Sequence, residues 1–156
     1  MKKILITRKL LKLSEDKAAK IFDVKFNLND EIYSNKKLID LSKNCDGILT
    51  SITDKIDEKT INALPDSVKI ISNFAVGFGN IDLDAASKKK IVVTNTPDVL
   101  TDATAEIGML LILGACRRAF EGIKNARESE WKWSADYLIG KQLTGKRLGI
   151  LGMGRI

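Results

Sequence analysis

The first hundred residues of this chain alternate short apolar runs with helical segments, and this alternation most constrains the fold. The apolar runs, each the length of one strand, are Lys3–Thr7, Val24–Asn27, Gly47–Thr50, Val68–Ser72 and Ile91–Thr94. The segments between them that we expect to be helical are Ser14–Ile21, Asn35–Lys43, Asp57–Ala63 and Leu83–Lys89. Strands that alternate with helices of this size pair in parallel. The pattern therefore predicts an α/β fold whose parallel sheet is covered by helices on both faces.

Two aspartates mark where helices are expected to start. Asp57 precedes a short segment that is stopped by Pro65, which is typical of a cap, a short helix and a stop. Asp82 stands just before Leu83, where its carboxylate can accept hydrogen bonds from the first free N–H groups of a helix. Both signals agree with the helices that the alternation predicts.

A segment of different character follows this region. Residues 101–106 carry cap-forming and acidic side chains, and Arg117 and Arg118 supply the positive charge that suits a helix C-terminus. Between them, residues 107–115 are apolar on every side apart from two glycines. A helix of this kind is either buried or spans a membrane, and a span needs about 20 apolar residues. We therefore expect a buried helix, between domains or in a subunit interface, and no contact with a membrane.

The remainder is a polar and aromatic segment followed by an apolar strand and a glycine motif. Residues 121–141, which include Trp131 and Trp133, indicate an arm or a linker, and Leu148–Leu151 is expected to start a second sheet. The strand runs into Gly-x-Gly-x-x at residues 152–156, and one further glycine would complete the turn that seats a dinucleotide pyrophosphate. In that turn the N-terminus of the next helix supplies N–H donors.

The charge pattern argues against a nucleic-acid-binding protein. The net charge is +6, but the lysines are spread from Lys2 to Lys146, and the one run of three, residues 88–90, has no interleaved aromatic residues. A solvated lysine-rich surface is the better interpretation. Cys45 and Cys116 have no metal-ligand spacing, so we expect no metal and two reduced core cysteines in a cytoplasmic protein. The apolar run at the N-terminus is too short for a signal peptide.

Several segments together resemble a known enzyme family. The two most specific are residues 71–82, ISNFAVGFGNID, and residues 93–106, VTNTPDVLTDATAE. Residues 52–57, the segment around Trp131 and residues 143–156 follow in the same order. The chain resembles the NAD(P)-dependent D-2-hydroxyacid dehydrogenases, most closely the glyoxylate and hydroxypyruvate reductases. The resemblance covers the whole chain but only about the first half of a family member.

The resemblance implies three regions. Residues 1–99 correspond to a flavodoxin-like substrate domain, which in the family is completed by the far C-terminal end of the protein. Residues 100–142 correspond to an interdomain helix and a dimerisation arm, through which we expect a homodimer. Residues 143–156 correspond to the first strand of a Rossmann domain that binds NAD or NADP in the complete protein.

The resemblance also implies the chemistry. In the family a hydride passes from the dihydronicotinamide to the keto carbon of a small 2-keto acid such as glyoxylate or hydroxypyruvate. A histidine paired with a glutamate donates the proton, and an arginine binds the carboxylate. All three would lie beyond Ile156, and the chain contains no histidine. We therefore expect no catalytic residue in this chain, which we interpret as an N-terminal fragment that is inactive alone and binds no cofactor.

The resemblance assigns substrate-binding residues to the first region. The backbone N–H groups of Val76 and Gly77 would hold the substrate carboxylate, and glycine lets a ligand come close. The alternative is a tight turn after a buried strand. Ile52 and Phe74 would be apolar walls of the site, or else core residues.

Cofactor contacts are implied at both ends of the chain. Val76 and the hydroxyl group of Thr104 would lie near the nicotinamide, although Thr104 could simply cap its helix. Gly152, Gly154 and the backbone of Arg155 and Ile156 would contact the pyrophosphate in a complete protein. Trp131 and Trp133 would pack on the partner subunit, but their spacing differs from that of the family, so packing alone is an equal alternative for them.

Two other functions stay open. The chain could be a non-catalytic dimerisation module that pairs through the long helix and the tryptophan arm, together with a separately encoded remainder. It could also be a co-repressor-like relative that senses a cofactor, which rests on fold analogy alone. Residues 147–156 lack sheet neighbours of their own, so we expect them to be frayed or to pair with another chain.

Overall fold

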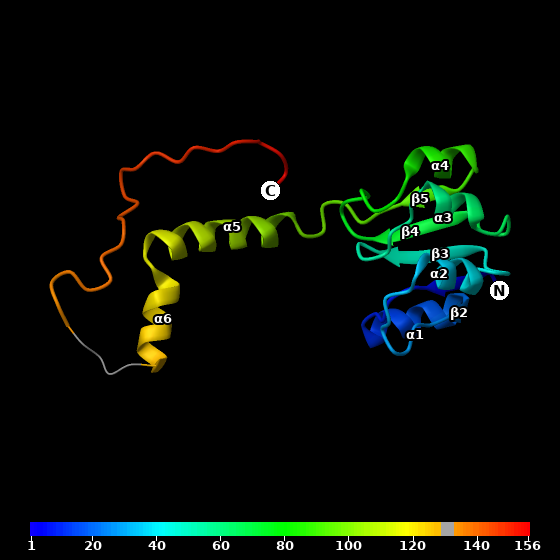
Figure 1. Cartoon of the computed structure of the whole chain (residues 1–156), viewed down its shortest axis with the longest axis horizontal. Coiled ribbons are helices and arrows are strands. Elements are labelled where there is room, and N and C mark those ends of the chain that lie inside the picture. Colours follow the sequence, from blue (N-terminus) through cyan, green and yellow to red (C-terminus); the bar gives the residue numbers. More distant parts are fainter. Residues whose placement is uncertain (129–132) are drawn as a thin grey trace. The chain divides into compact units, whose positions relative to one another are not determined.

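The computed structural model describes residues 1–128 and 133–156 of the chain (Figure 1). These residues form two compact units, 1–99 and 100–156, which are described separately below. Trp131 lies outside the described residues, so its predicted role is not addressed by the structure. The predicted boundary between residues 142 and 143 stays a prediction.

The first unit is built on a five-stranded sheet with the order β2-β1-β3-β4-β5. The strands are β1 (Lys3–Ile6), β2 (Asp23–Lys25), β3 (Gly47–Ser51), β4 (Ile70–Phe74) and β5 (Val92–Thr94). Every pairing between neighbours is parallel. This strand order is that of the flavodoxin-like folds, in which the chain changes direction across the sheet between β1 and β3. The predicted α/β fold and its parallel sheet are confirmed.

Four helices connect the strands of the first unit, and they are α1 (Lys12–Ile21), α2 (Asn35–Leu41), α3 (Glu58–Ala63) and α4 (Leu83–Lys88). Both predicted aspartate caps are confirmed. A carboxylate oxygen of Asp57 accepts a hydrogen bond from the N–H of Thr60 at 3.0 Å, and one of Asp82 accepts from the N–H of Ala85 at 2.9 Å. Each cap satisfies a backbone donor that has no partner inside its helix.

The core lies between the sheet and α2, α3 and α4. Leu5, Ile48 and Ile71 stand side by side across β1, β3 and β4, and each is at most 2% exposed. Residues of the three helices pack against them, among them Leu38 and Ile61. Burying a side chain of this kind contributes about 1.5–3 kcal/mol. This packing fixes the strand register that positions the loops at the carboxyl edge of the sheet.

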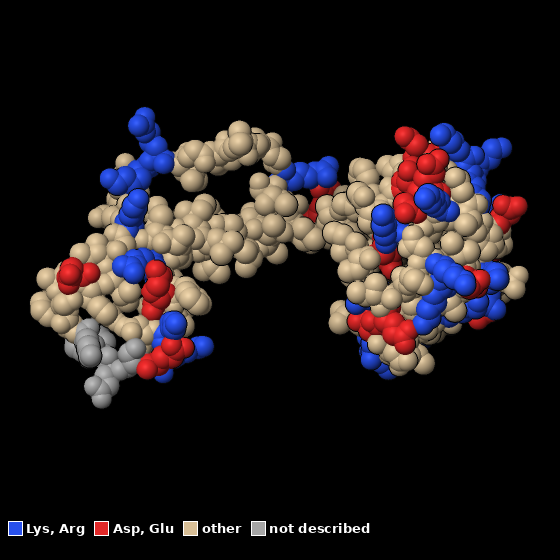
Figure 2. All heavy atoms as spheres, in the orientation of Figure 1, with Lys and Arg blue, Asp and Glu red and all other residues tan. Residues whose placement is uncertain are grey.

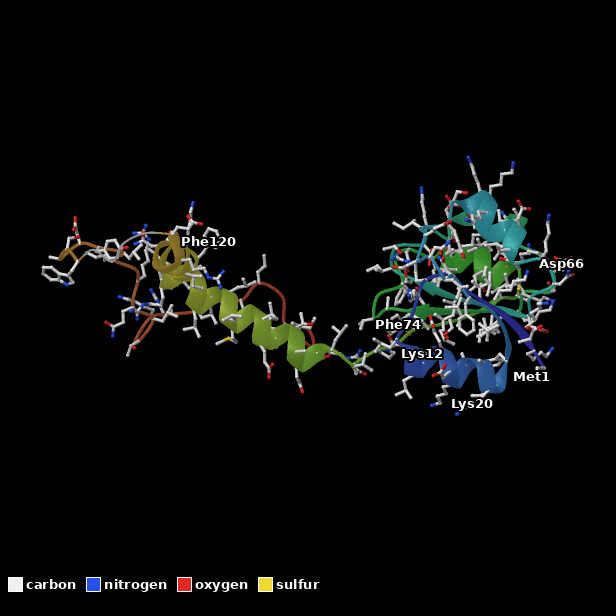
Figure 3. All side chains as sticks on the ribbon, turned by 90° about the horizontal axis from the view of Figure 1, so that it is seen from below. Met1, Lys12, Lys20, Asp66, Phe74 and Phe120 are labelled. Atoms are coloured by element: carbon white, nitrogen blue, oxygen red, sulfur yellow. The ribbon has the colours of Figure 1, made fainter. Side chains whose placement is uncertain are left out.

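The opposite face of the sheet is covered only in part. Figure 3 shows α1 on one side of the sheet and α2 on the other. On the α1 side, Ile70 is 39%, Phe74 62% and Val92 58% exposed. The prediction that helices cover both faces is therefore wrong for the β4–β5 half of this sheet within the first unit. The reason is geometric, because a helix about 10 Å wide covers only about two strands spaced at about 4.8 Å.

The sequence predicted a solvated lysine-rich surface, but one lysine of the first unit, Lys89, makes hydrogen bonds inside the protein. Lys89 donates hydrogen bonds from Nζ to the carbonyl groups of Ile61 at 3.0 Å and Asn62 at 2.9 Å, and also to that of Leu64. It thereby binds carbonyl groups at the end of α3, where that of Ile61 also accepts from the N–H of Leu64 at 3.1 Å. On the face that Figure 2 shows, the other charges of this unit alternate in sign and form no basic stripe.

The second unit contains α5 (Thr101–Cys116) and α6 (Ala119–Glu128). The predicted long helix is therefore present, and its burial between domains or in a subunit interface stays a prediction. Five of its large apolar side chains are about half exposed or more, and these are Ile107, Met109, Leu110, Leu111 and Leu113, whereas Ile112 is half-buried. A helix that is apolar on every side needs cover from all around, and the described residues of this unit cover only part of it. No helix among the described residues is long and apolar enough to span a membrane.

Residues 143–156 have no regular structure. The strand predicted at Leu148–Leu151 is not formed, because a strand is stable only when a neighbour satisfies its N–H and C=O groups, and the described part of this unit contains no strand. The expectation that residues 147–156 lack sheet neighbours agrees with this result. Trp133 is 75% exposed. Cys45 is buried and Cys116 is half-buried, and neither is in a disulfide, so the prediction of two core cysteines holds only for Cys45.

Candidate functional site

The candidate site lies at the carboxyl edge of the parallel sheet. In open α/β sheets this edge carries the ligand-binding loops. The structure brings four of the predicted residues to this edge. Ile52 follows β3, Phe74 ends β4, and Val76 and Gly77 stand in the loop that follows β4. Ser51 and Phe74 are direct neighbours in the sheet, so the two loops leave it side by side.

Three consecutive carbonyl groups of the β4 loop are held by the protein. The carbonyl of Ala75 accepts from the N–H of Thr96 at 2.9 Å, and that of Val76 accepts from Nδ2 of Asn95 at 2.7 Å. The carbonyl of Gly77 accepts from Nδ2 of Asn73 at 2.9 Å. These partners fix the direction in which each of the three peptide groups points.

The direction of the carbonyl groups sets the direction of the N–H groups. Every peptide bond in the described part of the chain is trans, so each N–H points opposite to the carbonyl of the same peptide group. The N–H groups of Val76, Gly77 and Phe78, here called the loop donors, thus point away from the groups that bind the carbonyls. Within the described residues none of the three donates to a protein acceptor. Free, oriented backbone N–H groups are suited to bind a carboxylate.

The space beside Gly77 is open. A Cβ atom built on Gly77 would have no atom within 4 Å, and its φ angle is not in the left-handed region. The backbone conformation therefore does not require glycine, and the alternative of a tight turn after a buried strand stays open. The absence of a side chain leaves the loop donors accessible to a ligand.

Ile52 and Phe74 are surface residues. They are 68% and 62% exposed, so the alternative that they belong to the core is wrong. Both stand where the strands end, beyond the cover that the helices provide. Phe74, labelled in Figure 3, also lines an open cavity of about 510 Å³ on the α1 side of the sheet, together with Leu49 and residues 9–11. The loop donors do not line this cavity, so Phe74 lies between the cavity and the β4 loop.

The sequence analysis missed the asparagines that hold the β4 loop. Asn73 is only 1% exposed, and Asn80 and Asn95 flank the loop in the fold. The available signal was that polar amides stand at both ends of a loop in which apolar and glycine residues predominate. A buried amide must satisfy its donors and its acceptor inside the protein, so each of these residues was a candidate for a structural hydrogen bond.

The predicted cofactor residues other than Val76 belong to the second unit. Thr104 lies in the first turns of α5, and its hydroxyl group donates to the carbonyl of Leu100 at 2.8 Å. It does not cap the helix, because the cap position is Leu100. Gly152 has a φ of 92°, in the left-handed region that favours glycine. The φ of Gly154 lies outside that region. These two glycines, Arg155 and Ile156 are exposed. The cofactor roles of these residues stay predictions.

The described part of the chain holds no cluster of metal-ligating side chains. It offers backbone N–H donors at one edge of a sheet and apolar side chains beside them. This arrangement can bind and orient a small carboxylate.

Comparison with known proteins decides the family. The family model for the catalytic domain of the D-isomer specific 2-hydroxyacid dehydrogenases matches residues 4–137. The chain belongs to this family. A glycerate dehydrogenase of Hyphomicrobium methylovorum is 40% identical over 99% of the chain, and a glyoxylate reductase of Korarchaeum cryptofilum is 36% identical over 99% of the chain. The family resemblance that the sequence analysis stated is therefore confirmed.

A solved structure of the family supports the fold. The chain aligns with a glyoxylate reductase from Paecilomyes thermophila at a TM-score of 0.80 and 29% identity, over 99% of the chain and 49% of that protein. The chain covers 48% of the glycerate dehydrogenase and 47% of the Korarchaeum glyoxylate reductase. It thus spans about half the length of the curated relatives it matches.

Two glycine substitutions test the geometry of the β4 loop. Gly77→Ala should leave the free energy of unfolding unchanged or raise it by up to about 1 kcal/mol, because its Cβ meets no atom and the unfolded chain becomes less flexible. Gly47→Ala should lower it by about 1–3 kcal/mol, because its Cβ would lie 2.7 Å from Cγ2 of Ile70. Urea unfolding measures both. A Gly77→Ala variant as unstable as Gly47→Ala would contradict the open geometry of the loop.

Proposed function

We propose that this chain is the substrate-binding part of an NAD(P)-dependent 2-hydroxyacid oxidoreductase that reduces a small 2-keto acid such as glyoxylate or hydroxypyruvate to the 2-hydroxy acid, in the D form where the product is chiral. The observation that carries the proposal is the β4 loop, in which the carbonyl groups of Ala75, Val76 and Gly77 are held while the loop donors have no protein acceptor among the described residues. Family membership and the names of the relatives agree with a small 2-keto or 2-hydroxy acid as substrate.

The residues of this chain would bind and orient the substrate. The N–H groups of Val76 and Gly77 donate to the carboxylate, where a charge-assisted hydrogen bond is stronger than a neutral one. Ile52 and Phe74 flank the bound molecule with apolar surface, which suits a substrate with little or no polar side chain. A carboxylate fixed at one end holds the keto carbon in one orientation for hydride transfer.

The cofactor of the complete protein is NAD or NADP, which supplies the hydride. Val76 and Thr104 would lie at its nicotinamide end, and Gly152, Gly154 and the backbone of Arg155 and Ile156 would contact its pyrophosphate. The left-handed φ of Gly152 fits such a turn. The flanking strand and helix that the turn needs are not formed by residues 143–156, so we propose that this chain alone binds no cofactor.

The proton donor is not among the residues of this chain. The sequence has no histidine, and the carboxylates of Asp102 and Glu106 stand in the first turns of α5. We therefore propose that catalysis needs an acid from residues outside this sequence, and that the reaction takes place in the cytoplasm, where free cysteines are stable.

A second candidate function is a non-catalytic dimerisation module. The observation that favours it is the exposure of the apolar side chains of α5 in the single chain. A helix of this composition is stabilised when another chain covers it. Dimerisation through residues 100–142 is compatible with both functions, so activity and association have to be measured separately.

A titration with glyoxylate tests the carboxylate site directly. We expect the amide resonances of Val76 and Gly77 in a ¹⁵N–¹H spectrum of the chain to shift with glyoxylate, and those of α1 to stay unchanged. Gly77→Ala should weaken the binding at least about tenfold, since the added methyl group occupies the approach to the donors. The absence of any shift at Val76 and Gly77 in the unmodified chain would overturn the proposed site.

An activity assay tests whether the chain needs further residues. The purified chain mixed with glyoxylate and either NADH or NADPH should show no oxidation of the cofactor, because it lacks the proton donor. A glyoxylate reductase from one of the relatives serves as the positive control. Turnover by the chain itself would show that the acid is present and that the proposal is wrong on this point.

Sedimentation at several concentrations tests dimerisation. We expect the chain to associate, and Leu111→Lys in α5 to shift the equilibrium towards the monomer, because a charge in an apolar interface costs free energy. Leu13→Lys in α1 is the matched control, since Leu13 is 82% and Leu111 66% exposed. A strict monomer at all concentrations would exclude the dimerisation module.

A further inference from the structure

Two amide side chains stand at the two ends of the β4 loop. Asn73 lies in β4 beside Thr50 of β3, on the face that α2, α3 and α4 cover, and is 1% exposed. Asn80 ends the loop and is half-buried. Neither takes part in the sheet ladder or in the apolar core through its side chain. Their hydrogen bonds therefore need a reason of their own.

The orientation of both amides follows from their partners. A carbonyl oxygen can only accept, so the amide nitrogen of Asn80 must face the carbonyl groups of Ser51 and Asp54, which it reaches at 3.1 Å each. The amide oxygen of Asn80 then faces Asn73 and accepts from its Nδ2 at 3.0 Å. The same Nδ2 donates to the carbonyl of Gly77 at 2.9 Å.

The acceptor of Asn73 is satisfied as well. The hydroxyl group of Thr50, which is fully buried, donates to Oδ1 of Asn73 at 3.1 Å. Both hydrogens and the oxygen of this buried amide are therefore used, and the side chain is held in one orientation. A fully satisfied buried amide is rigid in a way that an exposed one is not.

These bonds join parts of the site that are distant in sequence. The hydrogen bond between Asn73 and Asn80 links the two ends of the β4 loop to each other. The hydrogen bond from Asn73 to the carbonyl of Gly77 ties the middle of the loop back to its start. Through Asn80 the loop is also tied to residues 51–54, the turn that carries Ile52. This pair of side chains thus links the apolar wall at Ile52 to the loop donors, while the turn itself is also held by Asp54, whose Oδ2 accepts from the N–H of Ser51 at 2.8 Å.

We infer that Asn73 and Asn80 are positioning residues that hold the loop donors and Ile52 as one preformed carboxylate site. This inference rests on the proposed function. Neither side chain contacts the ligand, because all of their polar atoms face protein groups. They act by removing the cost of ordering the two loops when the carboxylate binds. The loss of either amide would leave the donors present but no longer held in one arrangement.

Asn27 provides a matched control for a purely structural role. It is 4% exposed, and its Nδ2 donates to the carbonyl groups of Thr7 and Glu31 at 2.7 Å each. Its Oδ1 accepts from the N–H of Glu31 at 3.2 Å. It is thus a buried asparagine that ties a loop after β2 and makes no contact with the β4 loop. Replacement of Asn27, Asn73 or Asn80 should destabilise the fold, because each replacement leaves a protein carbonyl group without its hydrogen-bond donor.

The experiment compares Asn73→Asp, Asn80→Asp and Asn27→Asp in the 156-residue chain. Aspartate keeps the shape but places a carboxylate oxygen against a carbonyl oxygen. We expect Asn27→Asp to bind glyoxylate as the unmodified chain does. Asn73→Asp and Asn80→Asp should each weaken binding at least about tenfold. Before glyoxylate is added, both should shift the amide resonances of Val76 and Gly77, and Asn80→Asp should also shift that of Ile52.

The outcomes separate this inference from the proposed function. If the unmodified chain does not respond to glyoxylate, the proposed function fails. The positioning role is then tested by the amide resonances of Val76 and Gly77 in Asn73→Asp and Asn80→Asp without ligand, which should still be shifted from those of the unmodified chain. Unchanged resonances and unchanged affinity in both variants would overturn the inference. If the variants do not fold, the measurement is made on the unmodified chain. We then expect a scalar coupling across the hydrogen bond from Nδ2 of Asn73 to the carbonyl of Gly77. A freely rotating Asn73 amide would overturn the inference.

Discussion

The parallel pairing of β3 with β4 is the constraint on which the candidate site depends. Its register places Thr50 beside Asn73 and Ser51 beside Phe74. Both strands therefore end at the same edge, and their loops leave side by side. The buried contacts of Ile48 and Ile71 with the helices hold this register, since a slip of one residue would turn the core side chains to the opposite face. The site thus takes its geometry from the core.

The proposed carboxylate site rests on how the backbone polar groups of the β4 loop are satisfied. The carbonyl groups of Ala75, Val76 and Gly77 all accept hydrogen bonds from the protein, and the loop donors have no acceptor in the part of the protein that the structure describes. Buried carbonyl groups need partners, whereas N–H groups at the surface can be satisfied by water or by a ligand. In the proposed function this loop donates to the substrate carboxylate through backbone N–H groups alone. The family to which the chain belongs is one of dehydrogenases of 2-hydroxy acids, whose carboxylate such a loop fits.

Local signals predicted much of the fold, and the errors share one cause. The strands and the caps at Asp57 and Asp82 depend on residues close together in sequence, and they formed as expected. The cover of the second sheet face and the strand at Leu148–Leu151 both depend on a partner surface. An apolar pattern shows that a surface favours burial, but it does not say what covers it. The hydrogen bonds of Asn73 with Thr50 and of Asn80 with Ser51 and Asp54 were missed because they join residues 50–54 to residues 73–80.

The sequence by itself determined the fold class, the family and the position of Val76 and Gly77 after a buried strand. These follow from local periodicity and from motifs, which are properties of neighbouring residues. Only the tertiary structure decided that Ile52 and Phe74 lie on the surface and that the loop donors are free. It also decided that Asn80 ties two loops together. The physical reason is that exposure and hydrogen-bond satisfaction depend on which distant residues meet, and the strand register settles that.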